Sequence, residues 1–209
     1  KIVDQITKYC KVLESADEIE EIFEEAYEQA TSGRNGPVWI DAPLDVQGAP
    51  YLKNTKKSSN FVKSINHDFN IEEVIDLLKN ARKPLFFWGN GVKLDKCEDL
   101  TTKLIGDYGL PSVFTWNASD ILDYNNKWNF GRPGVVAQRH ANFIVQKSDL
   151  IIAVGSSLDN VLTAYNPNNF APFAKKIIVN IDENQLLYCS VPKSIKICTS
   201  AKYFIKKLH

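Results

Sequence analysis

The sequence of 209 residues contains no methionine and only three histidines, His67, His140 and His209. The histidines lie far apart, so no pair has the spacing of a metal-binding motif. The sequence also has no P-loop and no G-x-S-x-G nucleophile elbow. The sequence therefore predicts neither a metal site nor a catalytic constellation in this chain. Because it begins at Lys1 rather than at methionine, we expect it to be a piece of a longer protein.

Net charge, long apolar runs and paired cysteines are also absent. The 25 basic and 25 acidic residues cancel, which leaves no electrostatic signature of nucleic acid or anionic membrane binding. No apolar run approaches the roughly 18 to 20 residues that span a bilayer, and no secretory leader opens the chain. The four cysteines form no C-x-x-C pair and are expected to be reduced thiols. We therefore expect a cytoplasmic protein that binds neither nucleic acid nor membrane.

The first part of the chain has a helix signal followed by a strand signal. Ser15 and Glu18 form an S-x-x-E capping box, apolar residues follow at helical spacing, and Gly33 is a stop signal. The apolar run 37–41 is typical of a buried strand. From about residue 47 to 69 the periodicity is lost and lysine, serine, glycine and proline are frequent, which predicts a linker between two domains.

Beyond the linker, helix and strand signals alternate. Continuous apolar runs, typical of strands covered on both faces, predict strands at 84–88, 111–115, 150–154, 176–181 and 195–199. Helices are expected after Asn70, over a segment bearing Leu94 to Ile105, at 139–147 and at 201–207. This alternation predicts an α/β, Rossmann-like domain with a five- or six-stranded, mainly parallel sheet flanked by helices.

Candidate binding residues follow the predicted strands, because ligands of open α/β sheets bind beyond the carboxyl ends of the strands. Gly89, Asn90 and Gly91 form a turn whose glycines allow close approach of a ligand, and the following backbone N–H groups could hold a diphosphate. A dinucleotide fingerprint needs a third glycine where this chain has Leu94, so NAD binding is weakly supported. A tight turn without any ligand is the alternative.

Other loops supply polar groups to the same edge. They contribute Thr115, Asn117, Arg132, Gly155, Ser156 and Asp182. The Arg132 guanidinium suits a phosphate, although a surface ion pair is the simpler alternative, and Asp182 could accept hydrogen bonds from ribose. We expect these residues to line one groove, flanked by the bulky Trp88 and Trp116. His140, at the start of a helix, and the acidic face of the first helix are expected to be solvated.

Several runs together resemble thiamine-diphosphate-dependent enzymes of the acetolactate-synthase-like group. These are the GPVWIDAPLDVQ run from Gly36 to Gln47, the GNGV turn at Gly89, the GRPGVVAQRHANF run from Gly131 to Phe143, the SDL strand start at Ser148, the NFAPFAKKI run from Asn169 and the VNID strand at Val179. The resemblance covers essentially the whole chain. It implies that residues 1–46 are the tail of a pyrimidine-binding domain, 47–69 a linker, and 70–209 the central, FAD/ADP-binding-like domain.

The resemblance also implies a function for a longer parent, which acts on 2-keto acids with thiamine diphosphate and Mg²⁺ in pyrimidine- and pyrophosphate-binding domains and forms homo-oligomers. The family's activating glutamate and its GDG…N metal motif do not occur here, so this chain is expected to be an inactive scaffold. Some members hold FAD or ADP in the central domain; many of those have GGG at Gly89–Gly91 and an aspartate at Asn180, where this chain differs. An NAD-dependent enzyme and a non-catalytic interaction module are the alternatives.

Overall fold

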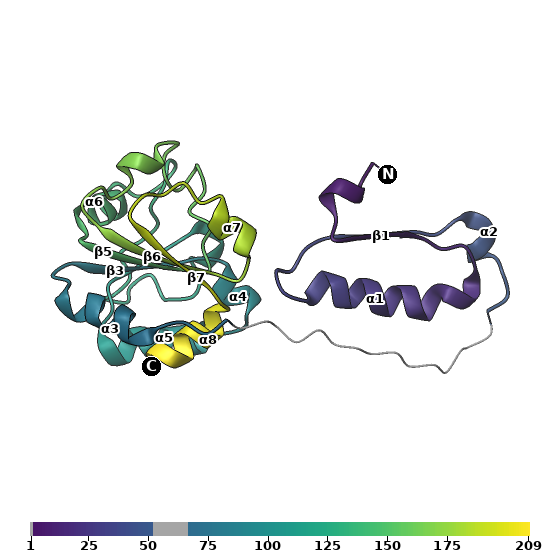
Figure 1. Cartoon of the computed structure of the whole chain (residues 1–209), viewed down its shortest axis with the longest axis horizontal. Helices are drawn as coiled ribbons and strands as arrows, with labels where there is room; N and C mark the ends of the chain where they lie inside the picture. Colours follow the sequence, from purple (N-terminus) through teal and green to yellow (C-terminus); the bar gives the residue numbers. More distant parts are fainter. Residues whose placement is uncertain (1, 52–66) are drawn as a thin grey trace. The chain divides into compact units, whose positions relative to one another are not determined.

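The computed structural model describes residues 2–51 and 67–209 and divides the chain into two compact units, Lys1–Ile65 and Asn66–His209 (Figure 1). Most of the linker predicted at 47–69 lies outside the described residues. The predicted division at 46 and 70 thus stays a prediction, and each unit is considered by itself.

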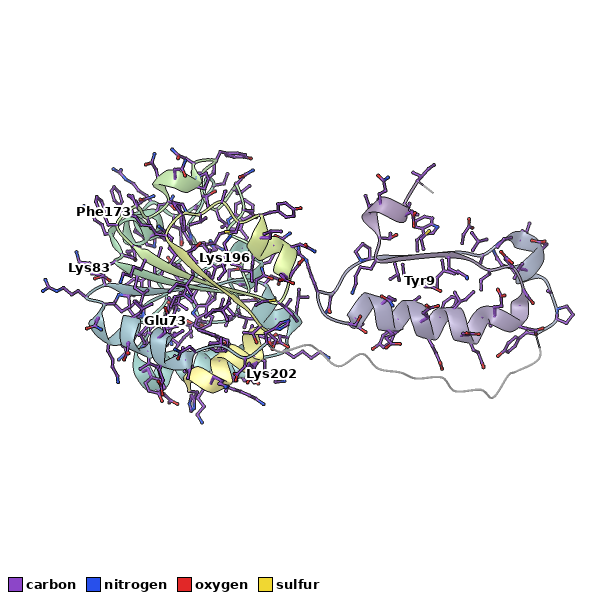
Figure 2. All side chains as sticks on the ribbon, in the orientation of Figure 1. Tyr9, Glu73, Lys83, Phe173, Lys196 and Lys202 are labelled. Carbon is purple, nitrogen blue, oxygen red and sulfur yellow. The ribbon has the colours of Figure 1, made fainter. Side chains whose placement is uncertain are left out.

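The first unit is a helix packed on a two-stranded parallel sheet. Its elements are η1 (Asp4–Ile6), β1 (Tyr9–Val12), η2 (Ala16–Glu18), α1 (Ile19–Thr31), β2 (Val38–Asp41) and α2 (Leu44–Gln47). The helix buries Ile22 and Ala26, at the spacing expected for one face. Tyr9, the first residue of β1, donates a hydrogen bond to Glu25 Oε2 on α1 at 2.8 Å (Figure 2). Burial and this hydrogen bond raise the pKa of Tyr9 to about 12.

The second unit contains a five-stranded sheet in which every pair is parallel. The strands are β3 (Pro84–Trp88), β4 (Ser112–Phe114), β5 (Leu150–Val154), β6 (Lys175–Asn180) and β7 (Ser194–Cys198), in the spatial order β4-β3-β5-β6-β7. The predicted parallel α/β fold is therefore confirmed. The helix and strand expected over 15–41 lie in the other unit, outside this sheet, also as predicted.

Helices cover both faces of the sheet (Figure 1). They are α3 (Ile71–Asn80), α4 (Gly91–Leu94), α5 (Glu98–Tyr108), α6 (Arg139–Lys147), α7 (Glu183–Leu187) and α8 (Ala201–Leu208), with short 3₁₀ turns η3 (Trp116–Ala118) and η4 (Pro167–Asn169). Successive strand residues face opposite sides. Phe86 and Trp88 therefore join the core beneath α3, α5 and α8, whereas Leu85 and Phe87 join the core beneath α6 and α7.

Two local features differ from the sequence prediction. The strand β1 was not predicted, and the single helix expected to bear Leu94 to Ile105 is two helices, α4 and α5. Lys96, between them, has φ 50°, a left-handed conformation that no α-helix contains. Among the described residues, no helix combines the length and the apolar character required to cross a bilayer.

Asp149 fixes the start of β5 next to the start of β3. Its Oδ2 accepts a hydrogen bond from Arg82 N at 2.8 Å, and its Oδ1 accepts one from Lys83 N at 2.9 Å. One carboxylate thus links two distant segments of the chain, because Arg82 and Lys83 precede Asp149 by 67 and 66 residues. This contact gives the SDL run a structural role in setting the sheet register.

We expect Asp149→Ala to lower the free energy of unfolding by about 2 kcal/mol, because two backbone donors lose a charged acceptor. Urea titration followed by circular dichroism measures this change. Asp76→Ala is the control, since Asp76 lies on the exposed face of α3, and it should change stability by less than about 0.5 kcal/mol. Equal effects of the two substitutions would contradict the role given to Asp149.

Candidate functional site

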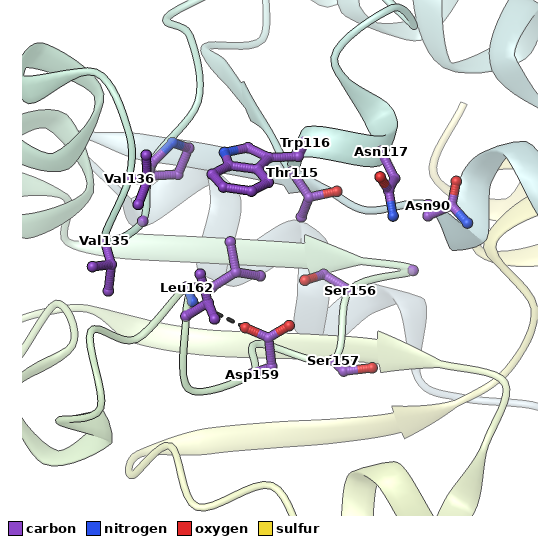
Figure 3. A pocket seen from close by; sticks show the side chains of 14 residues that line it. Asn90, Thr115, Trp116, Asn117, Val135, Val136, Ser156, Ser157, Asp159 and Leu162 are labelled. Atoms are coloured by element: carbon purple, nitrogen blue, oxygen red, sulfur yellow. Dashed lines mark hydrogen bonds between the residues drawn. The ribbon is translucent and has the colours of Figure 1, made fainter. Parts of the chain in front are cut away.

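A cavity of about 370 Å³ lies at the carboxyl edge of the five-stranded sheet (Figure 3). It is lined by residues from the segments after β3, β4 and β5 and from the 133–136 loop: Asn90, Thr115, Trp116, Asn117, Pro133, Gly134, Val135, Val136, Gly155, Ser156, Ser157, Asp159, Val161 and Leu162. Its volume is at the lower end of the range of about 300 to 1,000 Å³ for small-molecule sites. This is the edge at which the sequence predicts a ligand.

Five of the nine residues predicted for the site line this cavity. They are Asn90, Thr115, Asn117, Gly155 and Ser156, and they come from three separate segments of the chain. Gly89 and Gly91 lie in the turn behind the lining, whereas Arg132 and Asp182 are not among the lining residues. The structure thus brings the three central loops together but does not place Arg132, predicted to bind phosphate, or Asp182, predicted to bind ribose, in the cavity lining.

Three glycines bring the β3–α4 turn against the segment after β5. A Cβ on Gly89 would lie 2.2 Å from the carbonyl oxygen of Gly155, and one on Gly91 would lie 2.6 Å from the Cα of Gly155. Gly155 itself has φ +65°, and its carbonyl accepts a hydrogen bond from Gly91 N at 2.9 Å. The glycines of the turn therefore serve the contact between two backbone segments. The dinucleotide interpretation needs them for contact with a ligand, so the basis for the NAD alternative is weakened.

Three backbone donors of this turn, those of Gly91, Val92 and Lys93, are already used inside the protein. Gly91 N donates to Gly155 O, Val92 N donates to Gly89 O, and Lys93 N donates to Asn90 O, at 2.9 to 3.1 Å. These are the N–H groups that the sequence prediction directs at a diphosphate. In the structure their hydrogen-bonding capacity is met by carbonyl oxygens.

Asp182 caps the N-terminus of α7, the helix that follows β6. Its Oδ1 accepts hydrogen bonds from Asn184 N at 3.0 Å and Gln185 N at 3.4 Å, so Asp182 is the N-cap of α7. A carboxylate after a strand has the same sequence pattern whether it caps the next helix or faces a ligand. Here it is a cap.

Within the GRPGVVAQRHANF run, side chains at the start of α6 hold the loop that forms one wall of the cavity. Asn142 Oδ1 accepts a hydrogen bond from Gly134 N at 2.8 Å, and Asn142 Nδ2 donates one to Gly134 O at 2.9 Å. Gln138 Oε1 accepts from the backbone N of Arg132 at 2.9 Å. These contacts position the apolar wall of Val135 and Val136, while the side chain of Arg132 is exposed.

The cavity has little positive charge. Among the described residues that line it, Asp159 is the only ionisable one. Lys93, on α4, is paired with Asp120 at 2.7 Å between Nζ and Oδ2, and this hydrogen bond lowers the pKa of Asp120. Asp159 Oδ1 accepts a hydrogen bond from Leu162 N at 3.0 Å. An anion in the cavity would therefore meet a carboxylate and no lining cation.

Trp116 lines the cavity, whereas Trp88 does not. The Trp116 side chain is 54% exposed and lies on the Val136 side of the cavity (Figure 3). Trp88, expected to flank the pocket, is fully buried, and its Nε1–H donates to Ser112 Oγ at 3.0 Å. The prediction that Trp88 flanks the pocket is therefore wrong. Side chains alternate between the two faces of β3, and this alternation directs Trp88 into the core beneath α5.

The sequence prediction omitted most of the apolar lining and two polar residues. Ser157 and Asp159 follow β5 directly, in a loop already considered for ligand binding, so their position was a usable signal. Val135, Val136, Val161 and Leu162 lie in loops without periodicity, and only the folded chain brings them together. In residues 2–51 and 67–209 no group of three or more His, Cys, Asp or Glu side chains could hold a metal ion.

Together, these features describe a Rossmann-like α/β domain with a cavity at the carboxyl edge of its sheet. The chain belongs to the thiamine pyrophosphate enzyme family, whose central domain matches residues 71–208. That range begins at α3 and ends with α8, so the match coincides with the second unit.

Curated relatives are large subunits of acetolactate synthase. The chain is 29% identical to the isozyme 2 large subunit of Escherichia coli K12 over 185 residues, which cover 86% of this chain and 33% of that protein. It is 32% identical to the large subunit of Corynebacterium glutamicum over 187 residues, covering 87% and 29%. A probable large subunit of Methanococcus aeolicus is 28% identical over 210 residues, covering 97% and 35%. The chain thus spans about a third of the length of these relatives.

Proposed function

We propose that this chain supplies the central domain of a thiamine-diphosphate-dependent enzyme that acts on 2-keto acids, as an acetolactate synthase large subunit does. The match of residues 71–208 to the central domain of the family carries the proposal. Support also comes from the first unit, whose helix and strand precede the central domain in the order expected for the end of a pyrimidine-binding domain. In this proposal the parent protein joins or cleaves a bond next to the carbonyl carbon of a 2-keto acid.

The proposal assigns thiamine diphosphate and Mg²⁺ to other domains of the parent. The described residues offer no donor cluster for a divalent cation, and the cavity lining contains a single carboxylate. When bound, thiamine diphosphate supplies the nucleophile and the electron sink of the reaction. The role proposed for the present residues is to form a rigid scaffold, with two packed cores on the two faces of the sheet.

FAD or ADP, which some members of the family hold in the central domain, fits the cavity poorly. A diphosphate normally binds to cations or to free backbone N–H groups; no cation is among the described lining residues, and the N–H groups of Gly91, Val92 and Lys93 donate to carbonyl oxygens. We therefore assign no flavin chemistry to these residues.

Activity assays on two proteins test the proposal. The product of the gene that encodes this chain, read with its flanking sequence, is expected to form acetolactate from pyruvate when thiamine diphosphate and Mg²⁺ are added. The polypeptide 1–209 alone should form none and should not bind thiamine diphosphate tightly by calorimetry.

The two assays can fail separately. Acetolactate formation by the 209-residue polypeptide would contradict the assignment of the cofactor to other domains. Failure of the longer protein to convert pyruvate or any other 2-keto acid would contradict the proposed enzyme class.

A further inference from the structure

We propose that the exposed side chain of Phe173 inserts into the cavity of a second copy of this chain, so that copies associate head to tail. Phe173 lies in the turn before β6, at the amino edge of the five-stranded sheet, whereas the cavity lies at the carboxyl edge. The inference goes beyond the proposed enzyme function, because it concerns a contact between copies and no step of a reaction.

Phe173 lies at the tip of a tight turn in the NFAPFAKKI run. Ala174 N donates a hydrogen bond to Ala171 O at 3.0 Å, which closes a turn with Pro172 at its second position, where proline is favoured. The two alanines at the ends of the turn are fully buried, whereas Phe173 is 85% exposed (Figure 2). The core thus holds the ends of the turn and leaves the aromatic ring in solvent.

Two lysines fasten this turn. Lys193 Nζ donates a hydrogen bond to Pro172 O at 3.1 Å. Lys176 is almost completely buried, and its Nζ donates to Ala174 O, also at 3.1 Å. The carbonyl groups on both sides of Phe173 are therefore held in place. An aromatic side chain on ordered backbone loses less conformational entropy on binding than one on a flexible loop, so Phe173 is suited to anchor a protein interface.

Positive charge lies beside this anchor. Lys175 and Lys193 are exposed next to the turn, and within the described part of the chain neither forms an ion pair with a carboxylate. An ammonium group has three donors, so Lys193 can contact Pro172 and a partner at the same time. A surface that binds this turn should therefore combine apolar side chains with negative charge.

The cavity at the carboxyl edge offers this combination. Trp116, Val135 and Val136 line its apolar side and are 54%, 52% and 68% exposed. Figure 3 shows Trp116 and Val136 close together. Asp159 supplies the one carboxylate among the described lining residues, and none of these residues is a cation. An inserted phenyl ring would cover apolar surface that water now contacts, and a lysine beside it would meet a carboxylate.

One copy cannot make this contact within itself. The turn and the cavity lie at opposite ends of the strands, and the six residues of β6 span about 20 Å at roughly 3.3 Å per residue. The contact therefore needs two copies that present different surfaces to each other. Such a heterologous contact can continue to a third copy unless the rotation between copies closes a ring.

Sedimentation velocity of the 209-residue chain at a series of concentrations tests the proposal. We expect association between about 0.01 and 1 mM, as for a small interface with one anchoring aromatic residue. Phe173→Ala should weaken association at least about tenfold. Phe23→Ala is the matched control, since it removes the same atoms from an exposed position on α1, and it should leave association unchanged. Far-UV circular dichroism confirms that each variant is folded.

A mixture of two defective variants tests the head-to-tail arrangement. Asp159→Lys reverses the charge of the cavity, so this variant alone should stay monomeric, as should Phe173→Ala alone. Mixed, they should form a one-to-one dimer, because the Asp159→Lys chain still supplies the Phe173 turn and the Phe173→Ala chain still supplies the cavity. A wild-type chain that is monomeric at about 1 mM, association unaffected by Phe173→Ala, or a mixture that stays monomeric would each overturn the proposal.

Discussion

Replacing Gly89 with alanine is expected to lower the free energy of unfolding of the second unit by about 3 kcal/mol or more. The new Cβ would lie 2.2 Å from Gly155 O and 2.6 Å from the Cα of Ser156. Both obstacles are backbone atoms, which cannot move aside as a flexible side chain can. The clash can therefore be relieved only if the β3–α4 turn separates from the segment after β5. That separation breaks the hydrogen bond from Gly91 N to Gly155 O.

Gly106→Ala is the matched control. Gly106 lies within α5, and a Cβ there meets nothing within 4 Å. Because alanine has the higher helix propensity, this variant should gain up to about 1 kcal/mol. Urea titration by circular dichroism measures both variants. A Gly89→Ala protein as stable as the wild type would show that the two segments do not make this contact in solution.

The second large effect is expected for Trp88→Ala, which should cost about 3 to 5 kcal/mol. The Trp88 side chain is fully buried, stacks on Phe86 with ring centroids 5.3 Å apart, and donates its Nε1–H to Ser112 Oγ. Its removal leaves a large cavity between β3 and α5 and takes away the donor to Ser112 Oγ, which still donates to Leu110 O at 2.9 Å. Ser112→Ala, measured in the same way, removes both the acceptor of the Trp88 Nε1–H and the hydroxyl that donates to Leu110 O, and should cost about 1 to 3 kcal/mol.

Trp116→Ala provides the comparison for Trp88→Ala. The two substitutions remove the same atoms, but Trp116 is 54% exposed, so its loss should change stability by no more than about 1 kcal/mol. Similar losses for both tryptophans would contradict the assignment of Trp88 to the core and Trp116 to the cavity.

The sheet was predictable because its strands carry their own signal. Leu150–Val154 is a continuous apolar run, and the structure buries all of it. The strand Tyr9–Val12 was missed because its four residues include a lysine and its partner, Val38–Asp41, lies nearly thirty residues further along the chain. The helix break at Lys96 was missed because left-handed backbone at a lysine has no sequence signature.

The candidate site was predictable to the extent that topology determines it. The loops that follow parallel strands lie at one edge of the sheet. This rule was enough to predict that Asn90, Thr115 and Ser156 lie close together, and they line the same cavity. The rule gives no information on side-chain direction. Asp182 turned into the next helix as its cap, and the Arg132 side chain stayed exposed, because local hydrogen bonds and loop conformation determined each direction.

The contact among Gly89, Gly91 and Gly155 constrains how this domain can evolve. A Cβ on Gly89 or Gly91 would meet the backbone of Gly155, and a Cβ on Gly155 would meet the backbone of Gly91 and Val92, so no change of side chain at a neighbouring position can make room for it. Trp116 and Asp159 are exposed and are not packed in a comparable way, so substitutions there should change the free energy of unfolding little. Substitutions at the rim can therefore alter the lining of the cavity, while the three glycines behind it stay fixed.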